Sequence, residues 1–254
     1  MTKPTGIQRL AVTKQPINFC LYGDPGVGKT PLAGSSPQCL IIDSDQGTES
    51  AAAWGSKADF IECFDYSKLQ EIYEYLKDEK HNYKWVWWDS ITLFQERVLM
   101  DDIMVDAAAL NPRQERFIPS QREYLFNMNK LMTYVRLFCS LPMNFGITSI
   151  PMRVEDQETG DIQYMPHVSG KGMPQKLCAY MNVIGRLANV IVTDEAGKKK
   201  QVKRVHFRGT PEFYARDRFN ALGTHMDQPT IPKIQKLIEA KQSQGDKASA
   251  SDQD

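Results

Sequence analysis

Residues 23–30 read Gly23-Asp24-Pro25-Gly26-Val27-Gly28-Lys29-Thr30 and fit the pattern GxxxxGK[ST]. The apolar run Ile17–Tyr22 precedes them and a helical stretch begins at about Gly28, so the pattern lies between a predicted strand and a predicted helix. The glycines allow backbone N–H groups to converge on phosphate oxygens, and the helix amino terminus adds partial positive charge. In this pattern the lysine neutralises the β- and γ-phosphates and the threonine hydroxyl binds Mg²⁺. We therefore predict that residues 23–30 bind a nucleotide, with Lys29 on its phosphates and Thr30 on the metal.

A second apolar strand ends in a carboxylate that suits the same site. Trp85–Trp88 is followed by Asp89 and Ser90. A P-loop site needs such a carboxylate to hold Mg²⁺ through its water shell. We interpret the three tryptophans as aromatic packing on a buried strand, and Asp89 as the metal-site partner of Thr30.

A third apolar run, Leu40–Ile42, leads into Asp43 and Asp45. In a parallel sheet the carboxyl ends of the strands meet at the edge where ligands bind, so these carboxylates are expected beside residues 23–30. Either of them can orient an attacking water as a general base, and either can instead cap a turn. The residues alone leave both roles open for both positions.

Apolar runs alternate with helical patterns over the first 150 residues. The runs lack polar alternation, which is typical of strands covered on both faces of a parallel sheet; they are Ile17–Tyr22, Cys39–Ile42, Ile61–Phe64, Trp85–Trp88 and Asn144–Ile150. Helical patterns cover Tyr66–Lys77, 92–110 and 120–140. This order predicts a three-layer α/β domain. Beyond residue 181 we expect antiparallel strands at one edge of the same sheet and then a last helix, namely Val183–Thr193, Gln201–Arg208, Phe213–Ala215 and Ile231–Lys241.

The order of these parts resembles that of the RecA-like ATPases, and within them the compact phage ATPases linked to recombination and single-strand annealing. The resemblance covers roughly residues 16–222 and implies a RecA-like P-loop NTPase core, a mostly parallel sheet with antiparallel strands at its C-terminal edge. It implies ATP and Mg²⁺ as cofactors. Asp45 matches the family's catalytic acid, which is usually Glu, and Asp89-Ser90 matches its Walker B motif.

By the same resemblance two segments match DNA-binding loops. The strand Gly146–Ser149 carries Thr148-Ser149 where the family more often places a Gln or His sensor, and it leads into a mobile loop over 151–171 that closes at Gly172. The second segment is 111–117. Cations and aromatic rings together suit single-stranded DNA. The candidate DNA-binding residues are Arg153, Tyr164, Lys171 and Lys176 in and after the first segment, and Arg113, Arg116 and Phe117 in the second.

The segment Tyr214–Phe219 resembles the Lys-x-Arg finger of ring and filament ATPases, with Arg216 in place of the lysine and Arg218 as the arginine. Such a finger enters the nucleotide site of a neighbouring subunit and stabilises charge on the transferring phosphoryl group. The resemblance therefore implies a filament or ring with nucleotide between subunits. A solvated pair of surface arginines fits the same residues.

A cationic run surrounds the turn of the predicted C-terminal hairpin: Lys198, Lys199, Lys200, Lys203 and Arg204. It can contact a phosphate backbone or lie solvated at a hairpin tip. The sequence favours neither reading.

The composition bounds the remaining possibilities. The chain has 254 residues, 41% of them hydrophobic, and 31 Lys and Arg balance 31 Asp and Glu, so a sizeable core is expected and net charge does not decide for or against nucleic acid. Five dispersed cysteines argue against a disulfide framework or a structural zinc site. Without a membrane span or a secretion signal, we expect no membrane partner and a cytoplasmic location, that of the host if a phage encodes the chain. We divide the chain into an extended arm (1–15), one domain (16–241) and a disordered tail (242–254), which is a candidate contact for a single-strand-binding protein.

These expectations combine into a Mg²⁺-dependent ATPase that binds single-stranded DNA and promotes recombination by annealing or strand exchange. Two alternatives stay open. One is a ring-forming helicase, packaging or loader motor on a RecA core, and the other is a nucleotide-gated annealing protein with little hydrolysis. A small-molecule kinase is a weaker option, because neither a lid nor an acceptor pocket is recognisable.

Overall fold

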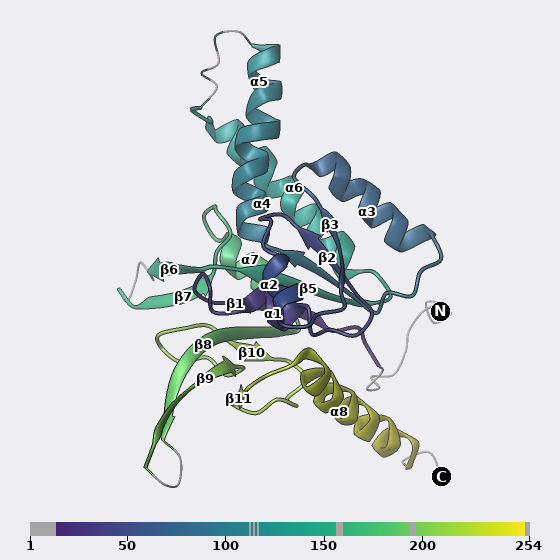
Figure 1. Cartoon of the computed structure of the whole chain (residues 1–254). Coiled ribbons are helices and arrows are strands. Elements are labelled where there is room, and N and C mark those ends of the chain that lie inside the picture. Colours follow the sequence, from purple (N-terminus) through teal and green to yellow (C-terminus); the bar gives the residue numbers. More distant parts are fainter. Residues whose placement is uncertain are drawn as a thin grey trace, which may run out of the picture.

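The structure is a computed structural model that describes residues 14–111, 113, 115, 117–155, 160–193 and 197–251, with side chains up to residue 244. A nine-stranded sheet forms its centre (Figure 1). The central strands are β1 (Asn18–Tyr22), β2 (Cys39–Asp43), β3 (Asp59–Glu62), β4 (Trp85–Asp89), β5 (Asn144–Ser149) and β8 (Val183–Thr193). At one edge lie β9 (Lys199–His206), β10 (Arg216–Asp217) and β11 (His225–Asp227).

The strand order is β11-β9-β8-β1-β5-β4-β2-β3, with β10 paired to the start of β8. All pairings from β8 to β3 along this order are parallel, whereas β9, β10 and β11 pair antiparallel. The predicted fold class, a mostly parallel three-layer sheet with antiparallel strands at the C-terminal edge, is therefore confirmed. β5 lies between β1 and β4. It therefore separates the strand that leads into residues 23–30 from the strand that ends in Asp89.

Helices cover both faces of the sheet. One face packs against α3 (Tyr66–Asp78), α4 (Ile91–Val98), α6 (Gln121–Cys139) and α7 (Met173–Tyr180). The other face packs against α1 (Lys29–Ala33) and α8 (Ile231–Ser251), and α2 (Glu49–Ala53) lies beside α1. No helix in the described part of the chain is long and apolar enough to cross a membrane.

The tryptophan-rich strand β4 shows why the central strands read as unbroken apolar runs. Trp85 and Trp87 point into the α8 side of the sheet and Trp88 into the other side, and all three are fully buried. Each indole N–H finds a partner, in Gln235, Ser36 and Ser44 respectively. Burying these rings without a polar cost requires such partners. The interpretation of these residues as core packing holds for all three.

A helical projection stands off the body of the molecule (Figure 1). It contains the end of α4, a π-helical turn η1 (Leu99–Ile103), α5 (Met104–Leu110) and the first turns of α6. Ser120 caps α6 together with Glu123 in a capping box, which defines where the chain turns back into a helix. The outer part of the projection is apolar and exposed, with Leu110 and Leu125 as clear cases.

The prediction of a mobile loop over 151–171 is wrong. The chain instead makes a two-stranded antiparallel sheet, β6 (Pro151–Glu155) and β7 (Ile162–Pro166). Hydrogen bonds then tie the following segment to α4: Thr92 donates to the His167 carbonyl, and the Gln95 amide pairs with both backbone groups of Ser169. These hydrogen bonds fix the segment that follows β7 against α4.

The expected strand over Phe213–Ala215 is also displaced. The regular pairing with β8 begins at Arg216, and Phe213 makes an isolated bridge to Tyr164 instead. β11 was not predicted. It is a three-residue strand that extends the edge beyond β9, and Arg204 on β9 forms a bidentate ion pair with its Asp227 at 2.6 and 2.8 Å. Such short pairings give too weak a pattern to be read from sequence.

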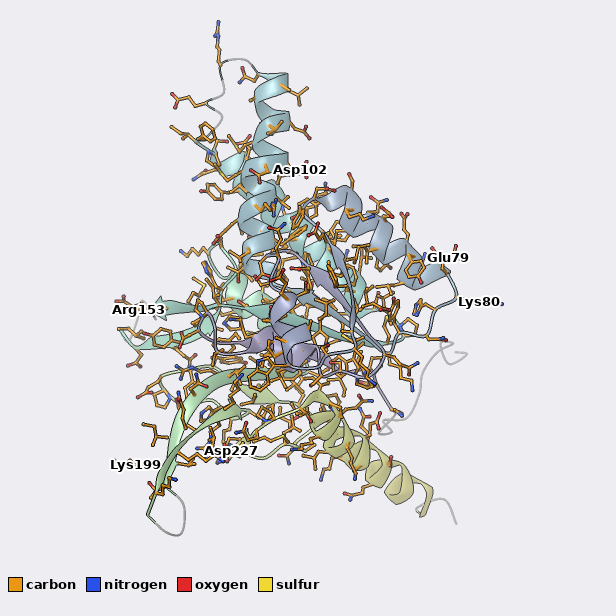
Figure 2. The ribbon with its side chains drawn as sticks, viewed as in Figure 1. Glu79, Lys80, Asp102, Arg153, Lys199 and Asp227 are labelled. Atoms are coloured by element: carbon orange, nitrogen blue, oxygen red, sulfur yellow. The ribbon has the colours of Figure 1, made fainter. Side chains whose placement is uncertain are left out.

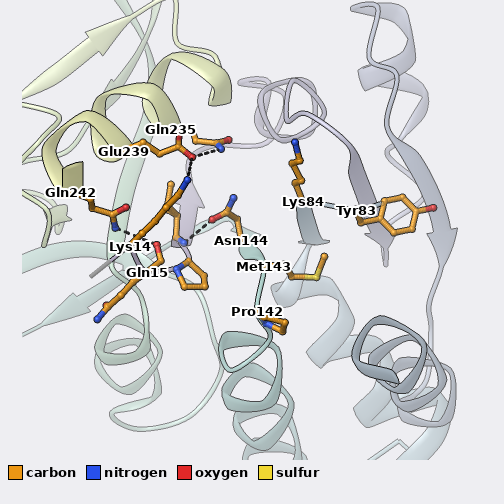
Figure 3. Close-up of a pocket in the computed structure, with 12 residues that line it drawn as sticks. Lys14, Gln15, Tyr83, Lys84, Pro142, Met143, Asn144, Gln235, Glu239 and Gln242 are labelled. Atoms are coloured by element: carbon orange, nitrogen blue, oxygen red, sulfur yellow. Dashed lines mark hydrogen bonds and ion pairs between the residues drawn. The ribbon is translucent and has the colours of Figure 1, made fainter. Parts of the chain in front are cut away.

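The last helix runs ten residues past Lys241, where we expected it to end, and continues through Ser251. Gln242, on this continuation, is buried, and its side-chain amide donates to the Gln15 carbonyl at 3.2 Å. Lys14 reaches Glu239 of the same helix at 3.5 Å (Figure 3). The Gln242 contact gives the first of the extra turns a support that composition does not reveal. Residues 1–13 of the expected arm and 252–254 of the expected tail lie outside the described residues.

A cavity of about 530 Å³ opens where α8 meets the amino ends of β1, β4 and β5 (Figure 3). Ile17, Lys84 and Asn144 lie at its wall. These residues precede the strands whose carboxyl ends carry the predicted nucleotide site, so the cavity lies at the opposite edge of the sheet.

Gly146 tests the packing of the sheet centre. A Cβ built at this position would lie 2.3–2.6 Å from three atoms of the Trp87 ring, a distance that real contacts do not reach. We expect Gly146→Ala to lower the free energy of unfolding by about 3 kcal/mol, measured by urea denaturation. In a Trp87→Leu background the same substitution should cost much less, because the ring is gone. Equal costs in both backgrounds would contradict this packing.

Candidate nucleotide site

The P-loop leaves β1 at the carboxyl edge of the sheet and wraps into α1. Gly23 lies so close to β8 that a Cβ would be 2.3 Å from the Leu187 carbonyl oxygen. Gly28, the residue before α1, has φ +101°, a left-handed conformation that favours glycine. Glycine is thus required at both ends of the loop for different reasons. Residues 23–30, predicted as the nucleotide-binding segment, form a loop that leads into the first two residues of α1.

Lys29 folds back onto its own loop. Its Nζ donates to the Gly23 carbonyl at 2.8 Å and to the Asp24 carbonyl at 3.1 Å. Burial lowers the pKa of Lys29, although the nearby carboxylates of Asp89, Asp45 and Asp24 work in the opposite direction. A cation held by two neutral carbonyls can transfer to phosphate oxygens at a gain, because these acceptors carry the opposite charge.

Asp89, at the end of β4, is a buried carboxylate of the site. Its Oδ1 accepts a hydrogen bond from Thr148 on β5, while its Oδ2 is buried and has no hydrogen-bond partner. Burial raises the pKa of Asp89, opposed by the hydrogen bond from Thr148 and by the nearby Thr30 hydroxyl. Its peptide bond to Ser90 is cis.

The unpartnered Oδ2 gives a test of the expected metal. A buried oxygen without a donor calls for one, and a Mg²⁺ ion or its bound water supplies the missing interaction. Thr30 and Asp89 therefore fit the predicted metal pair. Among the described residues no cluster of three or more His, Cys, Asp or Glu side chains could hold a metal by itself. This donor set suits an ion that keeps waters and phosphate oxygens as its other ligands.

The structure separates the roles of the two carboxylates after β2. Asp43 is buried, and its Oδ1 accepts the backbone N–H groups of residues 45, 46 and 47 at 3.1, 2.8 and 3.3 Å. Its Oδ2 accepts the Thr48 hydroxyl at 2.9 Å. Asp43 is thus the turn cap. Asp45 is only half-buried, accepts the Gly47 N–H at 3.1 Å, and interacts electrostatically with Asp89 and Lys29. Of the two, Asp45 is the carboxylate placed toward the nucleotide site.

The environment of Asp45 disfavours its charge. Burial, together with the neighbouring carboxylates of Asp89 and Asp43, raises the pKa of Asp45 to about 7. A general base works best with a pKa near the working pH. A bound cation would lower this value again, because it offsets the repulsion between Asp45 and Asp89.

The two positions where the resemblance places a γ-phosphate sensor are both engaged within the chain. Thr148 donates to Asp89, and the Ser149 hydroxyl contacts Thr92 and the backbone of His167. Both side chains are fully buried. They hold the Asp89 carboxylate and the segment that follows β7, and this is the structural role we assign to them.

The candidate DNA-binding residues fall into two groups that the structure does not bring together. Arg153 and Tyr164 face each other across the β6–β7 pair, and both are exposed; Figure 2 shows Arg153 on the outer side of this hairpin. Lys171 and Lys176 are exposed near the start of α7. Arg113 and Phe117 lie at the outer end of the helical projection, where Phe117 is 75% exposed, and Arg116 lies outside the described residues.

The two arginines of the predicted finger, Arg216 and Arg218, differ in exposure and in hydrogen-bond partners. One guanidinium nitrogen of Arg216 donates to the carbonyls of Cys178 and Met181, at the end of α7 in its own chain. Arg218 is exposed, and its guanidinium donates to the Ala179 carbonyl at 3.0 Å. The Arg218 backbone bonds to Asn182, which is level with Asn18 at the amino end of β1. Four residues of strand, about 13 Å, separate this level from the P-loop. Arg218 therefore lies near the edge of the sheet opposite its own P-loop.

Three residues of the site were not predicted. Thr148 was noted only as a departure from the usual sensor. Trp54, at the end of α2, is 70% exposed and lies under the Nζ of Lys203 at 4.1 Å from the ring centre. The sequence marks Lys203 only as one member of the cationic run over 198–204, with no role separate from its neighbours. Strand alternation could have separated it from Arg204, because neighbouring residues of a strand face opposite sides of the sheet.

A match to the protein family described as AAA domain covers residues 15–219, well over half of the chain. The chain belongs to this family. Among solved structures, this AAA domain is similar to the flagellar accessory protein FlaH from Methanocaldococcus jannaschii, with 8% identity, 75% of this chain and 79% of that chain covered, and a TM-score of 0.36. It is also similar to a second solved structure, described as an ATPase domain, with 12% identity, coverage of 81% of this chain and 86% of that chain, and a TM-score of 0.34. Comparison with curated proteins gives no match.

The raised pKa of Asp45 predicts a pH-dependent stability in the absence of nucleotide and Mg²⁺. The folded chain binds this proton more tightly than the unfolded chain, so stability falls as pH rises from about 4 to 7. Because the side chain is half-exposed, we expect a loss of about 1 to 2 kcal/mol after allowing for solvent screening. Unfolding of wild type and Asp45→Asn at pH 5 and pH 8 measures it.

The asparagine variant should lose less stability over this range than wild type. Asp24→Asn, which changes an exposed carboxylate of the neighbouring P-loop, serves as the matched control and should follow wild type. Identical pH dependence in wild type and Asp45→Asn would show that Asp45 is not held in a charge-disfavouring environment.

Proposed function

We propose that this AAA domain is a Mg²⁺-dependent ATPase that assembles on single-stranded DNA and promotes annealing or strand exchange. The observation that carries the ATPase is the buried, unpartnered Oδ2 of Asp89 in a cluster with Thr30, Lys29 and Asp45. Metal, phosphate and water each have a side chain of suitable chemistry there. The family supports a nucleotide-dependent domain at the coarse level.

Each residue has a distinct task in this proposal. Lys29 leaves the Gly23 and Asp24 carbonyls and binds the phosphates. Thr30 and Asp89 hold Mg²⁺, which when bound offsets the charge of the phosphates. Thr148 fixes the Asp89 carboxylate through its hydrogen bond. Asp45 orients the attacking water and takes its proton, a step that a pKa near neutrality favours.

The DNA part of the proposal rests on the β6–β7 hairpin. This hairpin follows β5 directly, and Tyr22, the last residue of β1, donates from its hydroxyl to the Tyr164 carbonyl at 3.2 Å. Exposed Arg153 and Tyr164 offer a cation and a ring, which together suit a phosphate backbone and stacked bases. The hairpin is also bonded to the strand that leads into the P-loop. DNA bound to this hairpin would thus lie close to the end of β1, where the chain enters the proposed nucleotide site.

The position of Arg218 supports the proposal of self-assembly. An arginine side chain is too short to reach from the amino edge of the sheet to the P-loop of the same chain, so a catalytic role would have to be in a neighbouring subunit. Arg218 is exposed and held by one carbonyl, whereas Arg216 is bonded to two. We therefore assign the role in trans to Arg218, with Arg216 as a structural support of the segment.

One observation favours a second candidate, a nucleotide-gated annealing protein with little hydrolysis. Both sensor positions of β5, Thr148 and Ser149, are engaged in bonds within the chain. A site without a polar group to sense the γ-phosphate can bind nucleotide and still turn over slowly. Strand annealing supported equally by ATP and by a non-hydrolysable analogue would favour this candidate over the first.

ATP hydrolysis, measured with and without single-stranded DNA over a range of protein concentrations, tests the proposal. We expect DNA to stimulate turnover and the rate per subunit to rise cooperatively with concentration, because the site is completed by a neighbour. Lys29→Ala should abolish hydrolysis, since the phosphates lose their cation. Unchanged turnover in Lys29→Ala would refute the site, and a DNA-independent rate would refute the DNA role.

The Arg218→Ala variant tests the neighbouring-subunit contact. We expect ATP binding to stay within about twofold of wild type and turnover to fall by on the order of 10²-fold or more, because the finger acts on the transition state. Mixing this variant with an excess of Lys29→Ala subunits should restore part of the activity, since each supplies what the other lacks. Loss of ATP binding in Arg218→Ala would assign the residue another role.

A further inference from the structure

We propose that Lys203 is a second phosphate-binding lysine of the nucleotide site, acting within its own chain and resting on Trp54 when no nucleotide is bound. The inference rests on the proposed nucleotide site and adds a residue that the P-loop pattern does not contain. Its ligand class is a nucleoside diphosphate or triphosphate, bound through the phosphates that both share.

The first observation is the position of the ammonium group. A Cβ built on Gly28 would lie 2.4 Å from Lys203 Nζ and 3.3 Å from its Cε, so the end of this side chain occupies the space beside the Gly28 Cα. Gly28 immediately precedes Lys29 and the first turn of α1. The backbone of this part of a P-loop cradles the α- and β-phosphates. Lys203 therefore places a positive charge next to the phosphate cradle.

The second observation is how weakly the ammonium group is held. Its Nζ lies 4.1 Å from the ring centre of Trp54, a side chain that is 70% exposed. None of the ion pairs found in the described part of the chain includes Lys203, whereas its neighbour Arg204 is bound to Asp227. A cation–π contact at an exposed site is weaker than a charge-assisted hydrogen bond to a phosphate. Phosphate should therefore displace the ring as the partner of Lys203.

The third observation is that the backbone needs no rearrangement. β9 lies between β8 and β11, with Lys203 opposite Asn189, and the Lys203 carbonyl accepts the Gln228 N–H at 2.8 Å. The backbone of Lys203 is thus held by neighbouring segments on both sides of β9. Only the flexible end of the side chain has to turn from the Trp54 ring to the phosphates, a movement on the scale of a rotamer change.

These observations divide the cationic run of the hairpin. Lys199 and Lys200 lie exposed near its outer end, and Figure 2 shows Lys199 far from the body of the molecule. Arg204 is bound to Asp227. Lys203 alone contacts the P-loop among the described members of the run whose contacts are given. The run is thus not a uniform patch for a phosphate backbone.

Binding of Mg²⁺-ATP, ADP and inorganic pyrophosphate, measured by calorimetry, tests the proposal. Lys203→Met keeps the aliphatic stem and removes the charge. We expect it to weaken all three ligands by about fivefold to tenfold, because the phosphates concerned are common to them. Lys203→Arg should restore most of the affinity. Lys200→Met, the same change at an exposed position of the same strand, should have less than a twofold effect.

Trp54 supplies an independent readout. The other three tryptophans are fully buried, so acrylamide quenching of tryptophan fluorescence reports mainly on Trp54, and Trp54→Phe identifies its share. Pyrophosphate has no base that could cover the ring. It should therefore increase quenching in wild type by drawing Lys203 away, and leave quenching in Lys203→Met unchanged and already high.

The outcomes separate the two proposals. If wild type binds the three ligands and Lys203→Met binds them equally well, the role of Lys203 is overturned and the nucleotide site stands. If only ATP binding weakens, Lys203 contacts the γ-phosphate and the assignment to the shared phosphates is overturned. If wild type binds none of them, the proposed function itself fails.

Discussion

The structure depends on one buried carboxylate, Asp89, at the end of β4. Three separate parts of the chain have to meet there: β4 supplies the group, β5 supplies the Thr148 hydroxyl that holds one oxygen, and the P-loop supplies Thr30. They meet only because β5 is inserted between β1 and β4. The apolar faces of these strands, packed by helices on both sides, fix that order. The sheet thus holds the Asp89 carboxylate out of water, with one of its two oxygens free of hydrogen bonds from the protein.

The charges around Asp89 are unfavourable to one another when no ion is bound. Asp45 and Asp89 repel each other and both have raised pKa values, while burial lowers the pKa of Lys29. Every one of these shifts disfavours the charged form. A bound cation and an anionic phosphate would reverse them together, so ligand binding and stability should be strongly linked in this domain.

The parts of the site that lie next to each other in sequence could be predicted from it. The P-loop pattern and the carboxylates that follow β2 and β4 are local signals, because a strand end and a turn are defined by a few neighbouring residues. The choice between Asp43 and Asp45 could not be made, since it depends on three backbone N–H groups that converge on Asp43 only in the folded turn.

Contacts between distant segments escaped the sequence for a related reason. Lys203 and Trp54 come together through the pairing of β9 with β8 and of β8 with β1, and no local pattern marks either residue. The hairpin over 151–166 and the strand at Arg216 are too short or too polar to show a clear period. The first of the extra turns of α8 is supported by Gln15, 227 residues away in the chain.

β8 has a mechanical consequence that its hydrogen bonds alone do not suggest. It is one continuous strand of 11 residues, about 36 Å long, of which the first part lies beside β1 and the rest extends with β9 away from the body of the molecule (Figure 1). At the point where it leaves β1, the Leu187 carbonyl touches Gly23 without room for even a methyl group. The β8–β9 extension is therefore anchored against the first residue of the P-loop, so a displacement of its outer part would act on the backbone of Gly23.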